Sequence, residues 1–233
     1  MAAGRRVTAR PGRRTGCQMI ETVRVIAEGP EETGHRLVLA HGASAPADSP
    51  FMNAVARGVA DRGVRVLRFE FPYMERQRSS GRRHPPDPMP ALLSHWEKVI
   101  RGLGSPETLV IGGKSLGGRV ASMIADRSGV AGLVCLGYPF HPPGRPDRLR
   151  VEHLRPLRTP TLIVQGTRDA LGSREEISTY HDLAQGIRIL FLEDGDHSFR
   201  PRVRSGHTLE GHIETACEAV AAFVKLTAAG SDP

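Results

Sequence analysis

The sequence predicts an α/β protein in which a mostly parallel central sheet of about seven strands carries helices on both faces. Three observations favour this class. Short apolar runs typical of buried strands alternate with segments of helical period along the whole chain. The connections between them are mostly short, as in sheets built from strand–helix–strand units. A length of 233 residues with 39% hydrophobic content fits a single domain of this kind better than two.

The N-terminal third of the chain starts the alternation. Three strands are predicted there, at residues 22–26, 36–40 and 64–69. The second is continuously apolar, which is typical of a strand in the middle of a sheet. Between the second and third strands, apolar residues recur at helical spacing: Phe51, Met52, Val55 and Val59. After Tyr73 the chain is rich in arginine and proline up to residue 91, and we expect a long polar loop there.

The remainder of the chain continues the same pattern. An amphipathic helix is predicted over residues 92–103, and the single tryptophan, Trp96, lies on its apolar stripe. Ser173 and Glu176 form a capping box for a helix that we expect to reach Leu183. A closing helix is predicted over residues 209–224. The four remaining strands are predicted at residues 109–112, 132–136, 160–165 and 187–192.

The strongest chemical motif lies where a predicted strand meets a predicted helix. Gly113-Lys114-Ser115-Leu116-Gly117 fits G-x-S-x-G, the nucleophile elbow, in which a serine occupies a strained turn. Both glycines are required because a Cβ at either position would collide with neighbouring backbone. The same letters end a P-loop motif, but that motif needs a glycine five positions before Gly113, where the chain has Thr108. The stretch therefore predicts a nucleophilic serine.

A nucleophilic serine needs a base and an acid that orients the base. Loops at the carboxyl ends of parallel strands converge on one edge of a sheet, so both groups are expected there. Asp169 follows one late strand and His197 follows the next, which gives the chain order Ser, Asp, His. We therefore predict Ser115, Asp169 and His197 as catalytic residues. Asp194 and Asp196 are weaker candidates, because side chains of neighbouring loop residues rarely point at one another.

The remaining residues of the predicted site are those expected to contact negative charge on the reaction intermediate or on the substrate. A tetrahedral intermediate needs two donors, and we expect the backbone N–H groups of Leu116 and Ala43 to form this oxyanion hole. Two arginine-rich loops follow strands that flank the elbow and are expected to overhang it. In these loops, Arg82 and Arg145 are possible contacts for a carboxylate or phosphate on the substrate. The alternative is a solvated basic surface.

Net charge is concentrated at the start of the chain. Residues 1–18 hold five of the 32 basic residues and no acid, so 27 basic residues face 25 acidic ones in the remainder. We expect residues 1–18 to be a disordered arginine-rich tail, residues 19–227 to form the folded domain, and residues 228–233 to fray. Met19 is an alternative start to Met1. A nearly neutral body argues against a nucleic-acid partner.

Composition also bears on compartment and cofactors. No run approaches the roughly 18 to 20 apolar residues of a membrane span, and no charged start leads into an apolar signal core. The three cysteines form no C-x-x-C pair, which is typical of a reducing compartment. We therefore expect a soluble, cytoplasmic protein without a membrane partner. His207 and His212 lack the H-E-x-x-H spacing, so we expect no metal, and no other cofactor.

The chain from Val23 to Lys225 resembles the α/β hydrolases. The short connection between its strands at Leu133 and Leu162 resembles the dienelactone-hydrolase-like branch, which implies that no lid domain is present. More narrowly, residues 69–76, 112–119 and 137–144 resemble the small family of testis-expressed protein 30 and subunit 3 of the NSL chromatin complex. That resemblance implies a hydrolase-like domain without a known substrate. True dienelactone hydrolases use cysteine where this chain has Ser115, so their activity is not carried over.

The leading hypothesis is a serine hydrolase that cleaves a small-molecule carboxylic ester or thioester through an acyl-enzyme. The alternative is a non-catalytic hydrolase fold used as a binding or scaffold module. A complete Ser, Asp, His set favours the enzyme. A peptidase is less favoured, because no additional domain is predicted that could gate peptides.

Overall fold

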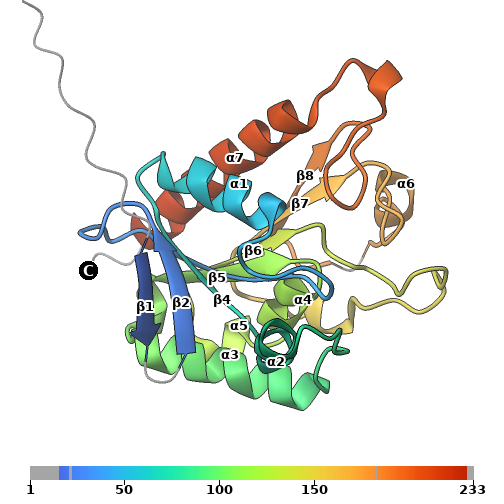
Figure 1. The fold of residues 1–233 in the computed structure, drawn as a ribbon. Coiled ribbons are helices and arrows are strands. Elements are labelled where there is room, and N and C mark those ends of the chain that lie inside the picture. The colour runs from blue at the N-terminus through green and yellow to red at the C-terminus, as the bar shows by residue number, and fades with distance from the viewer. Residues whose placement is uncertain (1–15, 21–22, 182, 230–233) are drawn as a thin grey trace, which may run out of the picture.

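Eight strands form one twisted sheet in the computed structural model, which describes residues 16–20, 23–181 and 183–229 (Figure 1). Their order across the sheet is β1-β2-β4-β3-β5-β6-β7-β8. The strands from β4 to β8 are parallel, whereas β1 and β2 run antiparallel to their neighbours. The strands are β1 (Gly16–Ile20), β2 (Val23–Glu28), β3 (Arg36–Ala40), β4 (Arg65–Phe69), β5 (Leu109–Lys114), β6 (Gly132–Leu136), β7 (Thr161–Gly166) and β8 (Ile187–Leu192).

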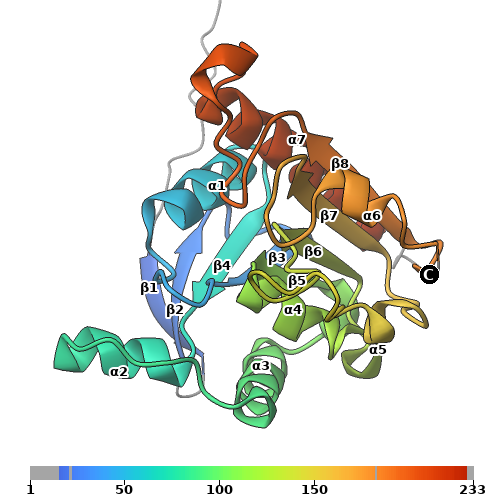
Figure 2. The same cartoon turned by 90° about the vertical axis from the view of Figure 1, so that its right-hand side faces the viewer.

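Helices cover both faces of the sheet (Figure 2). One face carries α1 (Pro50–Ala60) and α7 (Leu209–Ala229), and the other carries α3 (Met89–Leu103) and α4 (Leu116–Ser122). Successive strand residues point to opposite faces, so β3 feeds both layers: Leu37 and Leu39 pack with α1 and α7, and Val38 and Ala40 with α3 and α4. This double burial explains why β3 is continuously apolar. The prediction of an α/β sheet with helices on both faces is confirmed.

The polar loop predicted after the third strand is wrong in part. Residues 72–80 form helix α2 (Pro72–Ser80), with Pro72 in its first turn. Only Tyr73 and Met74 of this helix are buried. Its sequence therefore lacks the repeating apolar residues from which a helix is predicted. Ion pairs instead connect α2 to the body, since Arg78 contacts Glu70 and Arg76 contacts Asp87. Such pairs leave no periodic signal in a single sequence.

Two predicted boundaries at the ends of the chain need correction. Residues 16–18, assigned to the tail, lie in β1, which pairs antiparallel with β2. The β1 side chains are largely exposed, so this strand is held through its backbone and has no buried face to predict it. Helix α7 continues to Ala229, two residues beyond the predicted domain end. Residues 1–15 and 230–233 of the two predicted ends lie outside the described residues.

The helix predicted from the capping box is present but short. Ser173 Oγ accepts a hydrogen bond from Glu176 N at 3.2 Å, and Glu176 Oε2 accepts one from Ser173 N at 2.7 Å. The helix, α6 (Arg174–Ile177), ends well before Leu183. Ser178 and Thr179 hydrogen-bond through their hydroxyls to carbonyls of the preceding turn, a local alternative that competes with helix continuation.

The remaining short helical segments are α5 (Ala125–Ser128) and three 3₁₀ turns, η1 (Pro106–Thr108), η2 (Glu152–Leu154) and η3 (Val203–Ser205). Within the described ranges, no helix is both long enough and apolar enough to span a bilayer.

Candidate active site

Ser115 lies on a strained turn between β5 and α4. Its backbone has φ 50° and ψ −111°, outside the regions that residues with side chains ordinarily adopt. The turn presses against the end of β3. A Cβ at Gly113 or Gly117 would lie 2.3 or 2.4 Å from the carbonyl oxygen of Ala40. The two glycines of the motif are therefore required by close backbone approach, and this approach lifts the Ser115 side chain above the sheet edge.

The structure brings the three predicted side chains into one hydrogen-bonded series. The distance from Ser115 Oγ to His197 Nε2 is 2.9 Å, and that from His197 Nδ1 to Asp169 Oδ2 is 2.8 Å. They come from the carboxyl ends of β5, β8 and β7, which share one edge of the sheet. An ionised carboxylate only accepts, so Nδ1 carries the proton and Nε2 is free to accept the serine proton. This is the arrangement that activates a serine.

Asp169 is fully buried and is held by neutral donors. The backbone N–H of Leu171 donates to its Oδ1 at 2.8 Å, and Gln165 Nε2 donates to its Oδ2 at 2.9 Å. Gln165, at the end of β7, also bonds both backbone groups of Tyr138. Sequence reasoning missed this glutamine; its only signal is a polar residue at the end of an apolar strand. These two bonds fix the carboxylate through neutral donors.

The two alternative acids have other partners. Asp194 pairs with Arg202 and Arg168, and the hydrogen bond from Arg202 holds the pKa of this carboxyl far below its ordinary value. Asp196 Oδ1 accepts from the backbone N–H groups of Ser198 and Arg200 at 2.7 and 2.9 Å. Both acids thus shape the loop after β8 on which His197 is carried.

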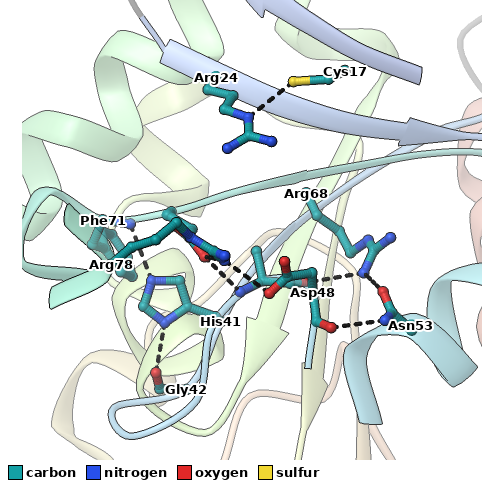
Figure 3. Close-up of polar contacts among 11 residues, drawn as sticks. Cys17, Arg24, His41, Gly42, Asp48, Asn53, Arg68, Phe71 and Arg78 are labelled. Carbon is teal, nitrogen blue, oxygen red and sulfur yellow. Dashed lines mark hydrogen bonds and ion pairs between the residues drawn. The ribbon is translucent and has the colours of Figure 1, made fainter. Parts of the chain in front are cut away.

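The loop after β3 is fixed by His41, whose bonds to Gly42 and Phe71 are drawn in Figure 3. His41 is fully buried; its Nε2 accepts from Phe71 N at 3.1 Å, and its Nδ1 donates to Gly42 O at 2.6 Å. Burial lowers the pKa of His41, which agrees with the neutral ring that these bonds require. Tyr73 donates to the carbonyls of Gly42 and Ala43. Contacts that link the ends of β3 and β4 therefore set the course of this loop.

The segments that carry the two predicted oxyanion donors both approach Ser115. An added Cβ at Gly42 would be 3.9 Å from the Cβ of Ser115, so the segment leading into Ala43 runs against the nucleophile. Leu116 is the first residue of α4, where a backbone N–H has no carbonyl partner within the helix. The helix N-terminus also favours negative charge at this point.

The predicted anion contacts, Arg82 and Arg145, are both exposed, and in the described chain no hydrogen bond or ion pair joins either to the triad residues. Helix α2, which precedes Arg82, extends away from β5 and α4 (Figure 2). Two other arginines belong to segments that adjoin the elbow, namely α4, which begins after Ser115, and the loop after β6, the strand next to β5. Arg119 is one turn beyond Ser115 in α4, and Arg150 is in the loop after β6.

A buried network connects the backbones of Arg119 and Arg150. Ser122 Oγ donates to Arg119 O at 2.7 Å, and Tyr138 OH donates to Arg150 O at 2.8 Å. Both hydroxyls also contact His153 Nε2, at 2.9 and 3.2 Å. Burial, followed by the charge of Arg119, lowers the pKa of His153 to about 4. Among the described residues no carboxylate pairs with either arginine, so this side of α4 keeps uncompensated positive charge.

Comparison with known proteins agrees with this fold. Residues 33–225 match the family described as an alpha/beta hydrolase domain. The chain belongs to this family. The match covers every strand from β3 to β8 and all three residues of the Ser115, His197 and Asp169 series.

Solved α/β hydrolases share the whole fold at low sequence identity. A dienelactone hydrolase from Anabaena variabilis is 20% identical with a TM-score of 0.67, covering 93% of this chain and 98% of its own. Est1E from Butyrivibrio proteoclasticus is 14% identical with a TM-score of 0.66, at 92% and 99% coverage. The esterase domain of a Rhodothermus marinus protein is 16% identical with a TM-score of 0.63, at 92% and 99% coverage.

Proposed function

We propose that this α/β hydrolase is a serine hydrolase that cleaves a carboxylic ester or thioester of a small molecule through an acyl-enzyme. The observation that carries the proposal is the hydrogen-bonded series from Ser115 through His197 to the fully buried Asp169. A serine hydroxyl is inert at neutral pH unless a neighbouring base accepts its proton, and this series supplies that base in the required tautomer.

In the first half-reaction, Ser115 Oγ attacks the carbonyl carbon while its proton passes to His197 Nε2. Asp169 stabilises the resulting imidazolium through Nδ1–H. The carbonyl oxygen becomes an oxyanion, for which we propose the N–H groups of Leu116 and Ala43 as donors. The intermediate collapses, the bond to the leaving oxygen or sulfur breaks, and His197 returns the proton to it. Water then attacks the acyl-enzyme by the same steps, releasing the acid and restoring Ser115.

We extend the proposal to the charge of the substrate. Arg82 and Arg145 stay candidates for contacting an anionic group, and the pair of Arg119 and Arg150, which has no carboxylate partner among the described residues, is a further candidate. A carboxylate or phosphate on the substrate would offset that charge through bidentate hydrogen bonds.

The resemblance to testis-expressed protein 30 and to subunit 3 of the NSL complex belongs to the same proposal. It names no substrate, and it leaves a scaffold role as the competing hypothesis. A scaffold has no need for a strained serine or for a neutral buried set of donors around Asp169. We keep a cytoplasmic setting and the absence of a nucleic-acid partner as further parts of the proposal.

The proposal is tested by labelling the purified protein with a fluorophosphonate and mapping the modified residue. We expect modification of Ser115, and loss of labelling in Ser115→Ala and His197→Ala. A panel of short acyl esters and thioesters then identifies the preferred bond. A folded protein that no phosphonate modifies, or that is modified elsewhere, would favour the scaffold hypothesis.

The charge of the substrate is tested with a neutral ester and its carboxylate-bearing analogue at low and high salt. We expect higher kcat/KM for the anion, a preference that shrinks with salt and in Arg119→Ala or Arg150→Ala. Arg82→Ala and Arg145→Ala are the matched variants for the two arginine-rich loops. Equal rates for both esters at every ionic strength would exclude an anion-binding role for all four arginines.

A further inference from the structure

Lys114, the residue immediately before the serine, is a buried lysine with an unusual partner. It is the last residue of β5, and only 9% of it is exposed. Its Nζ donates a hydrogen bond of 2.6 Å to the backbone carbonyl oxygen of His197. Burying an ammonium lowers the stability of the folded chain unless the group is paired. A lysine at this position is therefore expected to have a function.

The surroundings of Lys114 leave its ammonium little freedom. The ring of Phe51, from α1, lies with its centroid 5.5 Å from Nζ. The backbone of Gly137 closes the other side: a Cβ there would lie 2.8 Å from Nζ and 2.9 Å from His197 O. Gly137 has φ 64°, so both its conformation and its contacts require glycine. The bond between Lys114 and His197 thus lies in a space shaped to hold it.

The bond joins two segments that would otherwise be connected only through the reacting groups. The loop after β8 is anchored mainly to β7 and to itself, through bonds such as Arg168 N to Gly195 O and Asp196 N to Arg200 O. Within the described chain, two side-chain hydrogen bonds connect it to the elbow: Ser115 Oγ to His197 Nε2 and Lys114 Nζ to His197 O. Only the second persists when Ser115 leaves its resting position to attack.

We propose that Lys114 is a positioning residue that holds the backbone of His197 so that the imidazole keeps its distance and angle to Ser115. This inference rests on the proposed hydrolase function and adds a residue to it. Lys114 and Ser115 are adjacent in the chain, and the carbonyl and the imidazole belong to one residue. One bond therefore sets the separation of nucleophile and base, and small errors in such a separation cost large factors in rate.

The charge of Lys114 adds a pH dependence to this role. Two carboxylates face the ammonium, Asp169 after β7 and Asp196 after β8, and both favour its charged form. Burial outweighs them and lowers the pKa of Lys114 to about 8. Below that pH the bond to His197 O is charge-assisted and strong. Above it the amine is neutral and holds the carbonyl less firmly, so activity is expected to decline as pH rises through 8.

The test compares Lys114→Met and Lys114→Gln with the matched surface variant Lys225→Met, whose side chain is exposed on α7. We expect kcat of Lys114→Met to fall about 10- to 100-fold with KM changed less than threefold. Lys114→Gln restores a neutral donor and should recover part of kcat. Both should lose the decline above pH 8, which the wild type and Lys225→Met retain. Removal of a buried charge should leave the melting temperature of Lys114→Met unchanged or higher.

A readout independent of turnover keeps this proposal separate from the proposed function. In spectra of protein carrying ¹⁵N-labelled histidine, Lys114→Met should shift and broaden the His197 ring signals, whereas Lys225→Met should not. If the wild type neither reacts with phosphonates nor hydrolyses esters, the proposed hydrolase function is refuted. The spectra then test by themselves whether Lys114 positions His197. Unchanged His197 signals, or an active wild type matched by Lys114→Met in kcat and pH profile, would overturn the positioning role.

Discussion

Charged side chains at two edges of the same sheet have different kinds of partner. At the triad edge, defined by Ser115, Asp169 and His197, the buried carboxylate receives bonds from neutral donors and from the imidazole. At the arginine edge, defined by β1, β2, β4 and α2, each buried or half-buried arginine has a carboxylate or another fixed partner (Figure 3). Arg68 bonds Glu28 at 2.7 Å, and Arg78 bonds Glu70 at 2.6 Å.

The difference separates the side chains that we propose to react from those that stabilise the fold. Opposite charges paired at short range neutralise one another, so the arginine edge gains rigidity but offers little to a substrate. A cavity of about 340 Å³ lies there, lined by three arginines and three acids, and does not reach Ser115. At the triad edge Asp169 has no arginine partner among the described residues; its charge is opposed by the nearby ammonium of Lys114 and by His197 once that ring accepts a proton. Cavity volume would not have indicated the triad either, because larger cavities of about 570 and 590 Å³ also lie away from Ser115.

The largest expected effect comes from removing the negative charge at the triad edge. Asp169→Asn should lower kcat by about 10⁴-fold, because an amide cannot hold His197 in the tautomer that accepts the serine proton. The measurement is the rate of ester hydrolysis, or of phosphonate labelling of Ser115. Asp196→Asn is the control, since Asp196 precedes His197 in the loop after β8 and its carboxylate accepts hydrogen bonds from backbone N–H groups. Similar losses in both variants would contradict the assigned acid.

The corresponding change at the arginine edge should affect stability and leave catalysis intact. Arg68→Met leaves Glu28 buried without its partner, which typically costs about 3–5 kcal/mol of the free energy of unfolding. Urea unfolding measures this loss, and kcat at 25 °C should stay within about twofold. Arg78→Met is the matched control, because that side chain is 42% exposed and its pairs contribute at most about 1 kcal/mol. A large fall in kcat for Arg68→Met would show that the two edges are coupled.

Close backbone approach at the elbow is tested with Gly117→Ala. The added Cβ would meet Ala40 O at 2.4 Å and His41 O at 2.7 Å, both backbone atoms that cannot move aside easily. Overpacking of this kind costs about 1–3 kcal/mol or slightly more, and Ser115 should be displaced. Gly34→Ala is the control, since a Cβ there meets nothing within 4 Å. Equal unfolding free energies for the two variants would refute the steric argument.

The smallest expected effect is a loss of stability in acid that arises beside α4. The pKa of His153 is about 4 in the folded chain and 6.5 ordinarily, chiefly because the ring is buried. The unfolded chain therefore binds the proton first, so the contribution is present above pH 6.5 and is lost as pH falls to 4. Its size is at most about 3 kcal/mol and is reduced by partial exposure of the ring.

Unfolding of the wild type, His153→Gln and His181→Gln at pH 7, 5.5 and 4 measures this contribution. His153→Gln should lose less stability over the range than the wild type, and the exposed His181→Gln should follow the wild type. If all three proteins lose stability in parallel, the acid sensitivity has another source.

Local sequence determined most of the helices and strands and supplied the residues that we propose for the reaction. Strand and helix periods depend on spacings of two to four residues, so most elements from β2 to α7 could be predicted within a few residues. The elbow is equally local, since only glycine satisfies the backbone beside Ser115. The choice of Asp169 and His197 followed from chain order and from the rule that parallel strands end at one edge. Their catalytic role stays a proposal for the experiments above.

Tertiary structure decided what depends on contacts between distant segments. Strand β1 is held by backbone pairing, and α2 by ion pairs, so neither carries an apolar period. The roles of Gln165 and Lys114 depend on hydrogen bonds to other parts of the chain, up to 83 residues away. Arg82 and Arg145 were predicted as anion contacts because their loops are rich in arginine. Arg119 and Arg150 could be recognised as a pair only in the structure, where α4 and the loop after β6 come together. A single sequence records which groups are available, and the packing of the sheet decides which of them meet.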